Sequence, residues 1–117
     1  MTALTILFTT LTAFVFVAAA RAKFAEDEHV MQTRDRLAIR PAAYELIGAL
    51  EVAGAAGALI GLAFRPLGIA ALTGLVLVAL GACAAHVKLH EPADAARPAV
   101  FALVLSAGAL ALQLATA

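Results

Sequence analysis

The chain has 117 residues, of which 64% are hydrophobic and 14% charged, and its mean hydropathy is +1.00. An ordinary soluble domain is about 45–50% apolar and about 25% charged, and a core of this size cannot bury so many apolar side chains. The composition excludes a soluble domain and predicts one integral membrane domain covering residues 1–117. The formal net charge is zero, which excludes a strongly basic surface for nucleic acid.

Four apolar runs approach the length of about 20 residues that a helix needs to cross the hydrocarbon core. They cover residues 3–20, 43–64, 67–87 and 98–115. Hydrocarbon offers no hydrogen-bond partners to the backbone, so each run is predicted to be an α-helix. The period-two alternation of a membrane β-barrel is absent. Short connections favour antiparallel neighbours, which predicts an all-α, up-down-up-down four-helix bundle.

The first run raises the question of a cleaved signal peptide, because the sequence FVAAARA contains an A-x-A-like site. A secretory signal normally has basic residues before its apolar run, and none is present here. We therefore expect residues 3–20 to remain as a transmembrane helix.

The polar stretch 21–40 separates the first two runs. In it, Phe24 and Met31 are seven residues apart, and so are Val30 and Leu37. This partial amphipathicity fits a short helix in the headgroup region as well as it fits an ordinary solvated loop.

The basic residues predict an orientation. Of the eight Lys and Arg residues, seven fall in the stretch 21–40 or in the loop 88–97, and Arg65 alone falls on the other side of four spans. The positive-inside rule then places both of those loops in the cytoplasm and both termini outside, in a bacterial plasma membrane.

The second run is rich in small residues, which let transmembrane helices approach closely. Gly57 and Gly61 form a G-x-x-x-G pair, and Gly48 and Gly54 add to it. We expect this helix to be the packing centre of the bundle.

The same run contains two carboxylates. Glu51 lies eight residues inside it, about 12 Å along a helix axis, where an ionised carboxylate is costly unless it is protonated, hydrated or paired. Because Gly48 and Gly54 lie three residues before and after it, Glu51 is predicted to face other helices, in a functional site or in a structural hydrogen bond. Glu45 is nearer the boundary and is either a solvated end residue or part of the same site.

His86 is the candidate partner of Glu51. Antiparallel packing predicts that it lies at the depth of Glu45, about 9 Å from the level of Glu51, so that water or a ligand would bridge them. Such a pair suits proton transfer or a polar headgroup, and an interfacial histidine bonded to a carbonyl is the alternative. His86 and His90 also have metal-ligand spacing, but no third ligand stands at an obvious spacing, and we predict no metal.

Motifs of other chemistry are absent from the sequence. It contains no P-loop, Rossmann glycine fingerprint, G-x-S-x-G elbow or paired-cysteine motif. Cys83 is the single cysteine and cannot form an internal disulfide. The residues therefore assign no catalytic group, and both an enzymatic and a non-enzymatic role stay open.

Two stretches resemble signatures of the DoxX-like family. LIGALEVAGAAGALIGL resembles the second-helix signature, with Gly48, Glu51, Gly54 and Gly57 on its small and acidic positions. VALGACAAHVK resembles the third-helix signature, which ends in a histidine, here His86.

A third stretch, AARAKF, is similar to the family's pattern of glycine, two residues and lysine. It places Lys23 on the lysine and Ala20 where glycine is usual. The acidic cluster Glu26, Asp27 and Glu28 belongs to no such signature.

The resemblance implies a role in membrane redox chemistry. Similar proteins include a membrane subunit of an archaeal thiosulfate:quinone oxidoreductase, and others are linked to redox assemblies and oxidative-stress responses. By resemblance we expect a redox-associated or quinone-linked subunit with a polar pocket lined by Lys23, Glu51 and His86. The expected ligand is a quinone or a lipid.

Two alternatives stand beside this expectation. The first is a non-enzymatic module whose glycine-rich second helix assembles a homo-oligomer or joins a larger membrane protein complex. The second is a small carrier or channel that uses Glu51 as its coupling carboxylate.

Overall fold

The computed structural model describes residues 2–25, 31–32, 35, 40–88 and 93–115. Within these ranges it contains no strand and four long helices: α1 (Ala3–Phe24), α3 (Pro41–Ile60), α4 (Arg65–Lys88) and α5 (Ala93–Ala115). Each helix includes a window long and apolar enough to cross a membrane. The predicted all-α integral membrane fold is confirmed.

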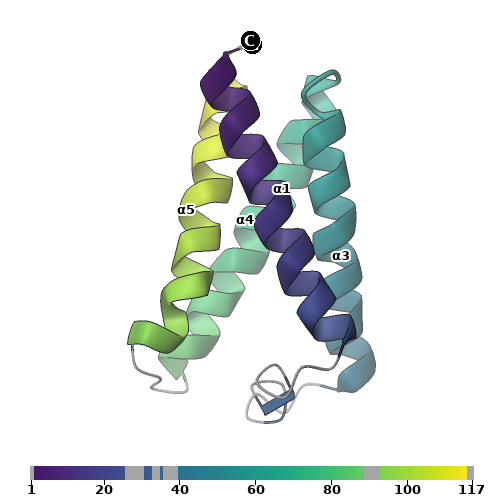
Figure 1. Cartoon of the computed structure of the whole chain (residues 1–117), viewed down its shortest axis with the longest axis vertical. Coiled ribbons are helices and arrows are strands. Elements are labelled where there is room, and N and C mark those ends of the chain that lie inside the picture. Colours follow the sequence, from purple (N-terminus) through teal and green to yellow (C-terminus); the bar gives the residue numbers. More distant parts are fainter. Residues whose placement is uncertain (1, 26–30, 33–34, 36–39, 89–92, 116–117) are drawn as a thin grey trace.

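The four helices form a closed ring in which neighbours in sequence are neighbours in space (Figure 1). α1 packs on α3, α3 on α4, and α4 on α5, which returns to pack on α1. Successive helices run in opposite directions, which confirms the up-down-up-down bundle. We call the end with the start of α1, the α3–α4 turn and the end of α5 the termini end, and the opposite end the loop end.

Helix bounds differ from the apolar runs at the end of α1, which continues to Phe24, at the turn between α3 and α4 and at the start of α5. α3 ends at Ile60 rather than at residue 64, and Gly61 caps it by donating its amide to the Gly57 carbonyl at 2.8 Å. α5 begins at Ala93 rather than at residue 98, and Pro98 lies inside the helix. An apolar run shows where hydrocarbon begins, whereas a helix continues into the polar interface. Pro98 is exposed there and removes only one hydrogen bond.

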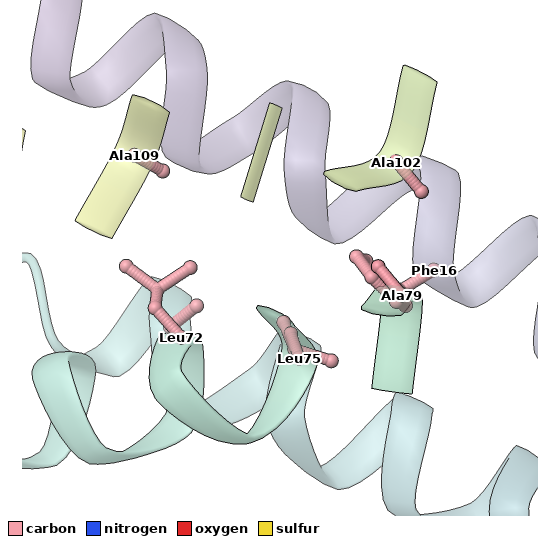
Figure 2. Close-up of a cluster of buried hydrophobic side chains, with 7 residues drawn as sticks. Phe16, Leu72, Leu75, Ala79, Ala102 and Ala109 are labelled. Carbon is pink, nitrogen blue, oxygen red and sulfur yellow. The ribbon is translucent and has the colours of Figure 1, made fainter. Parts of the chain in front are cut away.

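The core is built mainly from small side chains (Figure 2). Phe16 of α1 and Leu72 and Leu75 of α4 are its large members, and alanines fill the rest: Ala58, Ala79, Ala102 and Ala109. Lipid tails are as apolar as leucine, so close van der Waals contact rather than water exclusion holds such helices together. Many other large apolar side chains accordingly face outward, and Phe14, Leu77 and Val104 are each more than half exposed.

Glycines of α3 set its distance from α4. A Cβ atom on Gly54 would lie 2.7 Å from Leu75 Cδ2, and one on Gly57 would lie 2.8 Å from Ala71 Cβ. A side chain at either position would force the facing residue of α4 to move, so these glycines permit the close approach of the two helices. The same contacts fix the antiparallel register, because Gly54 lies level with Leu75 and Gly57 with Ala71.

Candidate functional site

A buried ion pair joins α1 to α3. The Lys23 Nζ atom lies 2.6 Å from Glu51 Oε1, and the two side chains are only 14% and 3% exposed. Lys23 comes from the last turn of α1, and its long apolar stem carries the ammonium inward to the carboxylate. Glu51 faces the other helices rather than lipid, and its charge is compensated by a residue of a neighbouring helix.

Small residues bring the two helices close enough for this pair. A Cβ atom on Gly48 would lie 3.3 Å from Phe24 Cζ and 3.6 Å from Lys23 Cβ, so the end of α1 lies directly on Gly48. Ala20 is completely buried one turn before Lys23. A methyl group is therefore accommodated where the family pattern has glycine.

Tyr44 completes the surroundings of the pair. Its ring centroid lies 5.4 Å from Lys23 Nζ, within the range of a cation–π interaction. Tyr44 is not among the site residues predicted from the sequence, although a signal was present. Tyr44 stands seven residues before Glu51, and a spacing of two helical turns places both on one face of α3.

The second carboxylate of α3 has a different environment. Glu45 is exposed, whereas Glu51 is buried. Within the described residues, the structure therefore separates the two acidic side chains: Glu51, and not Glu45, pairs with a cation, Lys23, at the α1–α3 crossing.

His86 lies at the loop end of α4, away from the level of Glu51 along the bundle axis. It occupies the last turn of α4 and is half-buried. Extending the α3–α4 register places it level with Ala43, eight residues from Glu51 and therefore about 12 Å away along the axis. The two side chains are too short to span this distance, so water molecules or a ligand would have to connect them.

A surface hollow lies along α1 rather than around Glu51. It has a volume of about 460 Å³ and is lined by Phe14, Val17, Ala18, Arg21, Ala22 and Ala25. Neither Glu51 nor His86 belongs to its lining. This hollow is therefore not the polar pocket predicted around these two residues, and that pocket stays a prediction.

Several expectations fall on residues that the structure does not describe. Among the described residues, no group of three His, Cys, Asp or Glu side chains is placed to hold a metal ion. His90, the acidic cluster 26–28 and most of the proposed headgroup helix lie outside the described ranges.

A second polar cluster, which the sequence did not predict, lies at the termini end. Arg65 of α4 donates from Nε to the Gln113 carbonyl at 2.9 Å and from a terminal guanidinium nitrogen to the Leu114 carbonyl at 2.7 Å. The buried Gln113 side chain donates to Thr9 Oγ1 at 3.2 Å. Arg65 therefore supplies positive charge to the C-terminal carbonyls of α5, where the helix dipole favours it.

Four apolar spanning helices around a core of small residues, with the Lys23–Glu51 ion pair buried between α1 and α3, define a small integral membrane protein. The profile of the DoxX-like family matches residues 7–109. The chain belongs to the DoxX-like family, which confirms the resemblance seen in its sequence. No curated protein and no solved structure matches it.

Proposed function

We propose that the protein is a redox-associated membrane subunit whose Lys23–Glu51 pair binds the polar head of a quinone or a similar amphipathic ligand. The observation that carries the proposal is the 2.6 Å ion pair buried inside the membrane-spanning region. Charges at such depth are costly, and intramembrane ionisable residues commonly mark ligand or proton pathways. The resemblance to quinone-linked members of the family supports the same role.

The residues of the pair suit the chemistry of a quinone. Reduction of a quinone to a quinol consumes two electrons and two protons. The electrons would come from a partner subunit that carries a redox cofactor. The Lys23 ammonium would donate a hydrogen bond to a quinone carbonyl, and Glu51 would exchange protons with that oxygen. Tyr44 would offer an aromatic wall to the ring.

Protons would reach the pair from the loop end. His86 is half-buried there, and an imidazole can both accept and donate a proton. Since about 12 Å of axial distance separates it from Glu51, water or the ligand itself would complete the path. We propose that the protein lies in a bacterial plasma membrane with its loop end facing the cytoplasm. Seven of the eight Lys and Arg residues lie in the loops or helix ends at that side.

The first test is whether a quinone accompanies the protein. Lipids extracted from protein purified in mild detergent are analysed by mass spectrometry, and quinone reduction is assayed in membranes that contain the partner. We expect Glu51→Gln to lose the quinone and the activity, and the exposed Glu45→Gln to keep both. The double variant Lys23→Gln/Glu51→Gln leaves no unpaired charge, and we expect it to fold but to be inactive. Wild-type protein without quinone, together with normal activity of both Glu51 variants, would exclude the proposal.

The observed packing gives less support to the alternatives. The glycine-rich side of α3 is contacted by α4 within the same chain at Gly54, Gly57 and Gly61, so an oligomer or a larger complex would have to form through other, lipid-facing surfaces. A carrier would show flux in liposomes that Glu51→Gln abolishes.

A further inference from the structure

We propose that the hollow along α1 is a binding site for one anionic phospholipid of the leaflet at the loop end. Arg21 would hold the charged headgroup, and the apolar part of the hollow would hold an acyl chain. The site is separate from the Lys23–Glu51 pair and does not depend on the proposed redox role.

The geometry of the hollow matches one leaflet of a bilayer. Arg21 lies in the last turn of α1, and Phe14 lies seven residues deeper in the span, about 10 Å along the axis. The hydrocarbon half-thickness is about 15 Å. The hollow therefore begins at headgroup depth and continues into the acyl region of the same leaflet.

The shape of the hollow suits a lipid chain. Three alanines leave room along the helix surface, and Phe14 and Val17 stand out from it, 72% and 45% exposed. Because α1 spans the membrane, acyl chains rather than water surround this surface.

The charge of the hollow selects the headgroup. Arg21 is exposed and is the only ionisable residue among those that line the hollow. A guanidinium binds phosphate oxygens in a bidentate manner. A zwitterionic headgroup brings its own ammonium to the same place, so the complementarity favours a lipid with net negative charge. Lys23, two residues on, points instead into the bundle toward Glu51.

The chain has no tryptophan, which allows a direct fluorescence test. In Phe14→Trp a single indole would report from the hollow. The protein is reconstituted with phosphatidylcholine plus either dibrominated phosphatidylglycerol or dibrominated phosphatidylcholine, and quenching gives the relative affinity of the two lipids. Leu77→Trp is the matched control, because Leu77 is 63% exposed on α4, eleven residues from the loop end of its helix.

We expect quenching of the indole in Phe14→Trp to show about a fivefold preference for phosphatidylglycerol, as one basic residue near a charged headgroup provides. Adding Arg21→Gln to this variant should remove the preference, and adding Arg21→Lys should keep most of it. Adding Lys88→Gln, which removes a positive charge from the same end of the bundle, should leave the preference unchanged. The Leu77→Trp control should show no preference. Equal quenching of the Phe14→Trp protein by both lipids, or a preference that survives Arg21→Gln, would overturn the proposal.

Discussion

Gly61 and Gly68 lie so close together, at the turn between α3 and α4, that a side chain on either would collide with the backbone of the other. A Cβ atom on Gly68 would lie 2.7 Å from Gly61 Cα, and it would also meet the Gln113 amide oxygen. The contact therefore fixes the α3–α4 hairpin and the end of α5 at one point.

Gly68→Ala should be strongly destabilising, because its methyl group has backbone on one side and a buried amide on the other. We expect a loss of about 1–3 kcal/mol in the free energy of unfolding, measured by denaturation with sodium dodecyl sulfate in mixed micelles. Gly74→Ala on the same helix is the control. A Cβ atom there has nothing within 4 Å, so its effect should stay within about 1 kcal/mol. Equal effects of the two substitutions would contradict the close packing.

Breaking the Lys23–Glu51 pair should cost more than removing it. Lys23→Met leaves the Glu51 carboxylate buried without its cation, which typically costs about 3–5 kcal/mol. The double variant Lys23→Met/Glu51→Leu should recover most of the loss, since apolar side chains of similar size often replace such pairs without penalty. A double-mutant cycle in mixed micelles measures the coupling. Additive effects would mean that the two charges do not stabilise each other.

Arg65→Ala should loosen the junction of α4 with the end of α5. It removes two charge-assisted hydrogen bonds to C-terminal carbonyls, with an expected loss of about 1–3 kcal/mol. Hydrogen exchange of the α5 backbone should rise near residues 113–115 and not near residue 100. Lys88→Ala, an exposed basic residue at the other end of α4, should change neither measurement.

Phe16→Ala and Phe14→Ala compare a core ring with a lipid-facing ring on the same helix. Phe16 is 2% exposed and Phe14 is 72% exposed. Because lipid solvates an apolar side chain as well as the core does, only the packing part of the usual penalty applies to Phe16. We expect the free energy of unfolding in mixed micelles to fall by about 2 kcal/mol in Phe16→Ala and by less than about 0.5 kcal/mol in Phe14→Ala. The reverse order would mean that α1 is rotated in the bundle.

The four spans and their topology could be predicted from hydropathy and loop length, because hydrocarbon allows only closed backbone hydrogen bonding. The ends of the helices could not. Residues 93–97 are too polar to join an apolar run, yet they are helical, since a helix does not stop where the hydrocarbon does.

The cation that pairs with Glu51 was only partly visible in the sequence. Lys23 entered through the resemblance, and it lies beyond the predicted span of residues 3–20. Helical spacing gives an independent reason to expect the Lys23 side chain inside the bundle. Lys23 lies three residues after Ala20 and seven after Phe16, on the buried face of α1. The Arg65 contacts had no such signal, because their acceptors are backbone carbonyls, which every residue carries.

The pairing of Lys23 with Glu51 also has an electrical consequence. An ammonium and a carboxylate held together form a dipole with no net charge, so a voltage across the bilayer does no net work when the two move as a unit. For a single unpaired charge in the same place, the electrical work would be about 2.3 kcal/mol for every 100 mV of potential that it crossed. Protonation of Glu51 alone, or loss of the proton from Lys23 alone, would therefore make this crossing of α1 and α3 respond to the membrane potential.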